Sequence, residues 1–280
     1  MANLPPEAPD SRDQGAPSSA AAGGLPVLLR DVFSGGFAGL IAGIVFLGAG
    51  SRLVMRGVAL LNPDSRGLVT DNENVVGEIT AGGTADLVIG TGLFGGLVAG
   101  TLWVLVRDWL PAGAGPRVAL AGALAALLGS FFVVSGDNED FHRLDGSAVL
   151  NIAMFVSIIG LTGATTPIFD AYMRARLPAG RVAARVYAPL VLLAGLPTLL
   201  ILIVAFLLGD DENQNQPPRL AGLFLVAVAL ATCAGWRRYF RTAENSTVSS
   251  SWQRRAVRAT LGAAALFGAI DLAGEINAIL

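Results

Sequence analysis

The chain has 280 residues, of which 53% are hydrophobic and only 14% are charged, and its mean hydropathy is +0.61. Soluble domains carry about 25% charged residues, so this composition excludes an ordinary soluble globular protein. All basic residues are arginines, the formal net charge is −2, and there is one histidine and one cysteine. The lack of lysine excludes a retinal Schiff base and the lone Cys233 excludes an internal disulfide. We expect no cofactor, no metal site and no nucleic-acid partner.

The apolar stretches predict an all-α membrane bundle. Residues 1–25 are rich in Pro, Ala, Ser and Gly and bury too little surface to fold, so we expect a disordered cytoplasmic tail at 1–25 and a transmembrane helical domain at 26–280. An apolar helix needs roughly 20 residues to cross a hydrocarbon core of about 30 Å. Seven stretches are near that length: 32–50, 84–106, 118–135, 147–168, 186–208, 220–236 and 257–279.

The arginines predict the orientation of this bundle. Most of them fall in the tail, in alternate loops or at the edges of those loops, as in the segment from Arg174 to Arg185. An arginine excess marks the cytoplasmic side of a membrane protein. The N-terminus is therefore expected inside and, with seven spans, the C-terminus outside.

Glycine spacing predicts which helices lie together. The first two spans each carry three glycines at positions i, i+4 and i+8, which lets helix backbones approach closely in lipid. We expect the two helices to pack against each other, with a homodimer contact as the alternative. The residues are Gly35, Gly39 and Gly43, and Gly92, Gly96 and Gly100.

Four charged residues intrude on the predicted spans: Arg52, Asp86, Asp271 and Glu275. The rise of 1.5 Å per residue places Asp271 and Glu275 in the outer third of the membrane, and it places Arg52 and Asp86 about 32 Å along the first and second spans. Four-residue spacing puts Asp271 and Glu275 on one helix face. A charge at mid-membrane costs about 2.5–3.5 kcal/mol on the insertion scale, so such residues usually face the bundle interior and pair. If their helices are adjacent, the four form an outward-opening cluster, which is either a structural ion-pair network or a ligand- or proton-coupled site.

Three segments carry a resemblance to other proteins. They are residues 52–56 (RLVMR), 79–84 (ITAGGT) and 137–141 (DNEDF). These are similar to segments of uncharacterised multi-pass integral membrane proteins of high-GC bacteria, over about the first half of the chain. The resemblance implies a location in the bacterial cytoplasmic membrane, and it implies no established activity and no functional residue.

Three classes of function are compatible with these sequence features. Because packing glycines are abundant and chemical motifs are scarce, we expect a structural or partner-binding integral membrane protein, in contact with the lipid bilayer and with copies of itself or another membrane subunit. The alternative is a small-solute or proton-coupled secondary transporter, in which the polar cluster would line a water-accessible cavity. An enzyme is third, since one histidine and one cysteine leave mainly carboxylates and hydroxyls for catalysis.

Overall fold

The computed structural model describes residues 24–69, 75–136, 138, 141–142, 148–207, 219–241 and 251–280. These residues are almost entirely helical, and apart from one isolated bridge between Val69 and Val75 they contain no β structure. The predicted all-helical class is confirmed, whereas residues 1–23 of the predicted tail lie outside the described part of the chain. The elements are α1 (Leu25–Ala42), η3 (Gly43–Gly50), α2 (Ser51–Leu61), η4 (Pro63–Ser65), α3 (Ala81–Asp86), η5 (Leu87–Leu93), α4 (Phe94–Val106), α5 (Ala114–Gly129), η6 (Ser130–Phe132), α7 (Ala148–Arg176), α8 (Arg181–Leu207), α9 (Arg219–Arg241) and α10 (Ser251–Ile279).

Within the described part of the chain, six helical segments are long and apolar enough, by length and composition, to cross a membrane. The seventh predicted span, at 118–135, corresponds to the shorter α5 of 16 residues. This helix ends early because the chain turns at Ser130 into the 3-10 turn η6, where the Ser130 hydroxyl donates to the carbonyl of Ala126. The six candidate spans are Leu25–Leu61, Ala81–Val106, Ala148–Arg176, Arg181–Val204, Leu220–Arg237 and Ser251–Ile279.

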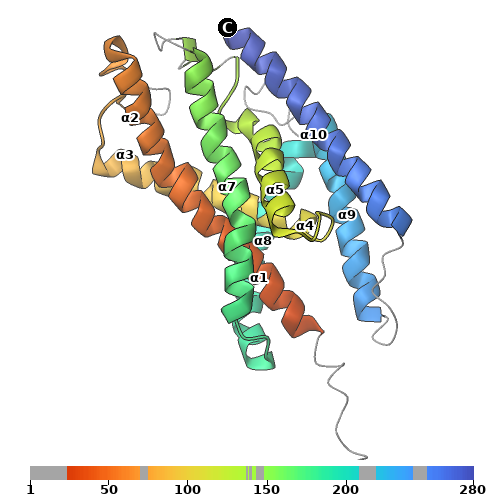
Figure 1. The fold of residues 1–280 in the computed structure, drawn as a ribbon. Coiled ribbons are helices and arrows are strands. Elements are labelled where there is room, and N and C mark those ends of the chain that lie inside the picture. The colour runs from red at the N-terminus through yellow and green to blue at the C-terminus, as the bar shows by residue number, and fades with distance from the viewer. Residues whose placement is uncertain are drawn as a thin grey trace, which may run out of the picture.

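The helices form an elongated bundle (Figure 1), and their contacts close into a ring. Helix α1 packs on α4 and on α7, α7 packs on α5, α5 on α10, α10 on α9, and α9 returns to α4. Helix α8 lies against α1, α4 and α9. The start of α1 and the C-terminus of the chain lie at opposite ends of this bundle.

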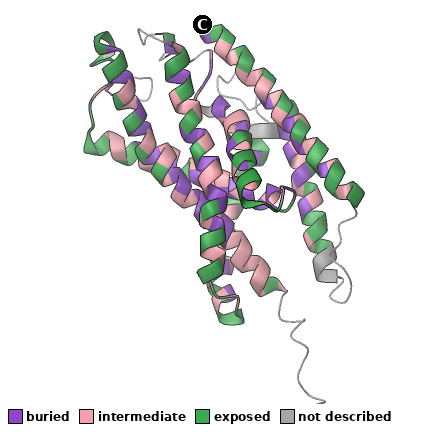
Figure 2. Ribbon diagram, viewed as in Figure 1, coloured by how far each residue is buried: buried purple, intermediate pink, exposed green. Residues whose placement is uncertain are grey.

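Burial follows the ring. Figure 2 shows buried residues concentrated where helices face one another and exposed residues along the outer sides. The outer face of α8 is the clearest case, because it exposes Val186, Leu190, Leu193, Leu196 and Leu200. A surface of this kind fits contact with lipid rather than water.

Candidate functional site

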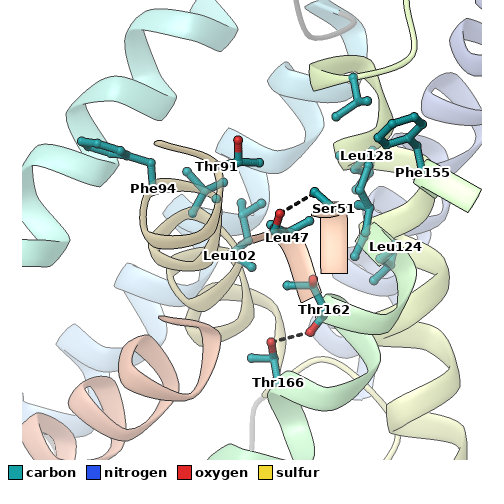
Figure 3. Close-up of a pocket in the computed structure, with 18 of the residues that line it drawn as sticks. Leu47, Ser51, Thr91, Phe94, Leu102, Leu124, Leu128, Phe155, Thr162 and Thr166 are labelled. Atoms are coloured by element: carbon teal, nitrogen blue, oxygen red, sulfur yellow. Dashed lines mark hydrogen bonds between the residues drawn. The ribbon is translucent and has the colours of Figure 1, made fainter. Parts of the chain in front are cut away.

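A partly open cavity of about 680 Å³ lies within the ring of helices (Figure 3). That volume lies within the range of about 300–1,000 Å³ that is typical of ligand pockets. Along α7 the lining residues run from Phe155 to Thr166, a length of roughly 16 Å at 1.5 Å per residue. The wall is mainly apolar, with Leu47, Phe94, Leu102, Leu124 and Leu128 among its larger side chains.

The polar groups in the wall are few and uncharged. None of the lining residues that the structure describes is charged, and their polar side chains are Ser51, Thr91, Asn138, Thr162, Thr166 and Thr198. Four of the hydroxyls donate to the carbonyl oxygen one helical turn earlier. These hydrogen bonds run from Ser51 to Leu47, from Thr162 to Ile158 (2.9 Å), from Thr166 to Thr162 (2.7 Å) and from Thr198 to Ala194 (2.7 Å).

Two π-helical segments, η3 and η5, lie opposite each other beside this cavity. Their backbones touch at glycines: a Cβ atom on Gly92 would lie 3.1 Å from the Cα of Gly48. Leu47 of η3 and Thr91 of η5 both line the cavity. Short π-helical turns are rare and are frequent at functional sites. Within a membrane, irregular backbone is tolerated where it is buried in protein or lines a cavity.

The glycines singled out in the sequence lie in the contact between these two chain segments. A Cβ atom on Gly96 would lie 2.8 Å from the carbonyl oxygen of Gly39, and one on Gly100 would lie 3.0 Å from that of Gly35. A Cβ atom on Gly43 would collide with the backbone of Gly92 and Gly96. The close approach of the first two long helices therefore depends on the absence of side chains at these positions.

A buried carboxylate, that of Asp170, lies just beyond one end of the cavity. This end of the bundle is here called the Asp170 end. Asp170 of α7 is fully buried, and its Oδ1 accepts a hydrogen bond of 2.8 Å from the hydroxyl of Ser34 on α1. Its Oδ2 accepts from the indole Nε1 of Trp103 on α4 (2.8 Å), and it pairs with Nη2 of Arg174 (3.0 Å) and Nη1 of Arg107 (3.5 Å). Trp103 and Thr166, one turn before Asp170, both line the cavity. This network joins α1, α4 and α7 next to the cavity, at its Asp170 end.

A second polar network, here called the Trp109 network, joins α9 and α10 to the end of α4 at the same end of the bundle. The indole Nε1 of Trp109 donates to the hydroxyl of Thr232 on α9 (2.8 Å), and this hydroxyl lies 2.8 Å from the carbonyl oxygen of Leu105. The guanidinium Nε of Arg258 on α10 donates to the carbonyl of Trp109 (2.8 Å). Together the two networks hold α1, α4, α7, α9 and α10 to one another at the Asp170 end.

The structure divides the predicted charged cluster between two sides of the bundle. Arg52 is buried on α2, and one of its guanidinium nitrogens lies 3.9 Å from the sulfur of Met55. Asp86 is exposed at the end of α3. Both helices lie on the side of the bundle away from α10, which carries Asp271 and Glu275 (Figure 1). The four side chains therefore do not meet as one group.

Asp271 and Glu275 lie near the end of the bundle opposite Asp170. Glu275 accepts a hydrogen bond from the backbone amide of Gly136, which follows η6, and the carbonyl of Gly136 is 2.7 Å from Nε2 of His142. Asp271 is half-buried one turn earlier on α10. The hydrogen bond of Glu275 thus joins α10 to the segment after α5. Neither Asp271 nor Glu275 lines the cavity.

Sequence reasoning missed Asp170, the most completely paired carboxylate among the described residues. The predicted span ended at residue 168, which placed Asp170 among the arginines of a loop. The structure continues α7 to Arg176, and α1 and α4 cover this last part of the helix. An available signal was the spacing of Asp170 and Arg174 by four residues, which permits an ion pair along one helix.

A metal centre has no counterpart in the described part of the chain, where no three or more His, Cys, Asp or Glu side chains group closely enough to hold an ion. The described residues that line the cavity offer apolar surface, hydroxyl groups and one amide to a ligand. Such a wall can bind a ligand, and it offers no charged residue as an acid, a base or a nucleophile.

Comparison with known proteins gives no relative. No protein-family description, no curated protein sequence and no solved structure matches this chain. Conclusions about function therefore rest on the cavity and its surroundings alone.

Proposed function

We propose that the chain is an integral membrane protein that binds a small, largely apolar molecule in the cavity of its helical bundle. The observation that carries the proposal is the cavity itself, with its volume of about 680 Å³ and its uncharged, mainly apolar wall. A bundle that served only as a scaffold would be expected to fill its centre with side chains at the density of other protein interiors.

The proposal includes a topology of seven spans, with α5 as the shortest. Two observations support it: the start of α1 and the C-terminus lie at opposite ends of the bundle, and the Asp170 end carries Arg107, Arg174 and Arg176. Arginine-rich ends face the cytoplasm, so the Asp170 end is proposed to lie inside and the C-terminus outside. The proposed location is the bacterial cytoplasmic membrane, where copies of the chain or another subunit would be neighbours.

Access to the cavity is proposed from the membrane or from the end opposite Asp170. Two networks hold five helices together at the Asp170 end: the contacts of Asp170, and those of Trp109 with Thr232 and Arg258. A ligand that entered at this end would have to break these buried hydrogen bonds and ion pairs. A ligand that partitions into the bilayer meets no such barrier at the apolar helix faces. This favours an apolar or amphiphilic ligand over a water-soluble ion.

Trp103 provides the test, because it lines the cavity while Trp109, Trp236 and Trp252 do not. The full chain would be placed in lipid nanodiscs with these three tryptophans replaced by phenylalanine, and the same titration of the parent protein, in which the Trp109–Thr232 hydrogen bond is intact, serves as the reference. Addition of 1-bromododecane, whose bromine quenches indole fluorescence on contact, is expected to quench Trp103 along a saturable curve. Quenching by probe dissolved in the bilayer alone would rise linearly and would contradict the proposal.

A matched pair of variants controls for effects outside the cavity. Ala99 on α4 lines the cavity, whereas Ala123 on α5 is exposed on the outside. Ala99→Phe is expected to remove the saturable part of the quenching by occupying the space, and Ala123→Phe is expected to leave it intact. Equal loss in both variants would place the probe elsewhere.

Transport of the same molecule is the second candidate. It is favoured by the difference between the two ends of the bundle, because two networks join five helices at the Asp170 end, whereas the Glu275–Gly136 hydrogen bond joins α10 to the segment after α5 at the other. A carrier of this kind would open the Asp170 end after loading. In proteoliposomes, transport predicts that the protein accelerates the passage of a fluorescent dodecyl probe across the bilayer, whereas a binding protein leaves that rate equal to the rate in protein-free liposomes.

A further inference from the structure

We propose that the cavity selects an uncharged amphiphile whose polar group is a hydroxyl, such as a long-chain alcohol, and that Thr91 binds this hydroxyl. The inference rests on the proposed function and goes further, because it names the chemical class of the ligand and the side chain that recognises its polar end.

The charge of the ligand follows from the wall. Among the described residues that line the cavity there is no arginine, aspartate, glutamate or histidine. Two sets of buried charges lie near the wall. Arg52 follows the lining residue Ser51, and one of its guanidinium nitrogens lies 3.9 Å from the sulfur of the lining residue Met55. In the Asp170 network both carboxylate oxygens already accept hydrogen bonds, from Ser34 and Trp103, and the arginines supply the counter-charge. An ionised group that enters an apolar site without a partner loses its hydration at a cost of several kcal/mol. The wall itself therefore offers no counter-charge to a carboxylate, a phosphate or an ammonium group.

The hydroxyl groups of the wall indicate which kind of polar group the ligand carries. Ser51, Thr162, Thr166 and Thr198 each have a single hydroxyl proton, and each donates it to its own helix backbone. Their oxygens retain only lone pairs, so they can accept a hydrogen bond from a ligand and cannot donate one. A ligand whose polar group is only an acceptor, such as an ester or ketone, gains nothing from these four groups.

Thr91 is the exception among the hydroxyls. Its side chain makes no hydrogen bond to any residue that the structure describes, and Figure 3 draws it in the wall without the dashed line that joins Ser51 to Leu47 or Thr166 to Thr162. Thr91 lies within the π-helical segment η5. It can both donate and accept, which complements the one donor and two acceptor sites of an alcohol.

Competition against 1-bromododecane in the Trp103-only protein tests the inference. The competitors share one chain length: dodecane, 1-dodecanol, dodecanoate at pH 9 and dodecyltrimethylammonium, with each concentration measured in the bilayer. We expect 1-dodecanol to bind about threefold to tenfold more tightly than dodecane, the range for one neutral hydrogen bond. The two ions are expected to bind at least tenfold more weakly than the alcohol.

Variants of Thr91 test the residue assignment. Thr91→Val is expected to lower the affinity for 1-dodecanol to that for dodecane while leaving dodecane and the probe unchanged, and Thr91→Ser is expected to restore the preference. Thr165→Val is the matched control, because Thr165 of α7 does not line the cavity and its hydroxyl donates to the carbonyl of Leu161 (2.7 Å); it is expected to change none of the affinities.

The outcomes distinguish a failure of this inference from a failure of the proposed function. Saturable quenching in which an ion competes as well as the alcohol, or in which alkane and alcohol compete equally, overturns the inference and leaves the cavity as an apolar binding site. A normal alcohol preference in Thr91→Val overturns the role of Thr91. The ranking of competitors needs only the parent Trp103-only protein, so it decides the ligand class even if Thr91→Val does not fold. Absence of saturable quenching by 1-bromododecane itself contradicts the proposed function.

Discussion

The indole nitrogen of Trp103 donates a 2.8 Å hydrogen bond to Oδ2 of Asp170, while the same side chain forms part of the cavity wall. One residue thus connects a cavity without charged lining residues to a buried charged network. A ligand that displaces the Trp103 ring would stretch this hydrogen bond, and a change in the Asp170 network would move the ring. Binding and closure of the Asp170 end are therefore expected to influence each other.

The charge of Asp170 is predicted to stabilise the fold. Asp170→Asn keeps an oxygen for hydrogen bonding but leaves the buried Arg107 without its nearest buried counter-charge, so we expect a loss of about 3–5 kcal/mol in the free energy of unfolding. Asp108→Asn is the control, because Asp108 lies 3.8 Å from the same guanidinium but is 58% exposed; it should cost at most about 1 kcal/mol. Unfolding by SDS in mixed micelles measures both, and equal losses would contradict the role of burial.

The contact between α1 and α4 is predicted to tolerate no Cβ atom at Gly39. Gly39→Ala is expected to destabilise by about 1–3 kcal/mol, because the new methyl group meets the backbone of Gly96 and Gly100. Gly36 lies on the same helix, and a Cβ atom there meets nothing within 4 Å. Gly36→Ala should therefore be neutral, or stabilise by up to about 1 kcal/mol through helix propensity. A ranking in the opposite order would place Gly39 outside the contact.

Arg52 and Glu275 are predicted to act independently. The two residues lie on different sides of the bundle, and mutations at distant sites usually add within about 0.3–0.5 kcal/mol. A double-mutant cycle of Arg52→Met and Glu275→Gln, read from the free energy of unfolding, is expected to give a coupling energy within that range. A coupling energy above about 1 kcal/mol would show that Arg52 and Glu275 interact, and would contradict their placement on different sides of the bundle.

The topology is predicted to place the α7–α8 connection and the C-terminus on opposite sides of the membrane. A reporter that is active only in the cytoplasm should work when inserted after Pro178 and fail when fused to Leu280. Activity at both positions would require an even number of spans after α7, and would contradict the passage of α8, α9 and α10 through the bilayer.

Some of the fold follows directly from the sequence. Apolar length alone predicts the helical class, because a membrane offers few alternatives to a helix of about 20 residues. Spacing of glycines by four residues pointed to the two helices that lie together at Gly39 and Gly96, since such spacing places small residues on one face. Both signals are local periodicities, which a single sequence contains in full.

The site depends on information that local patterns lack. Asp170 becomes buried because α1 and α4 cover the end of α7, and no residue near Asp170 in the sequence specifies that covering. The π-helical form of η3 and η5 has no distinct pattern in Gly43–Gly50 or Leu87–Leu93, because the same residues suit an α-helix. Arg52, Asp86, Asp271 and Glu275 were grouped by their depth in the membrane, which fixes one coordinate and leaves the side of the bundle open.

The ring of helices has a consequence for the order of events during synthesis. Lining residues of the cavity extend from Leu47 to Leu261, and α10 is the element that connects α5 to α9. Until α10 leaves the ribosome and inserts, the cavity lacks the part of its wall that Leu261 provides next to α5 and α9. The first occupant of the cavity is therefore expected to be an uncharged apolar or amphiphilic molecule of the bilayer, taken in when the last helix inserts.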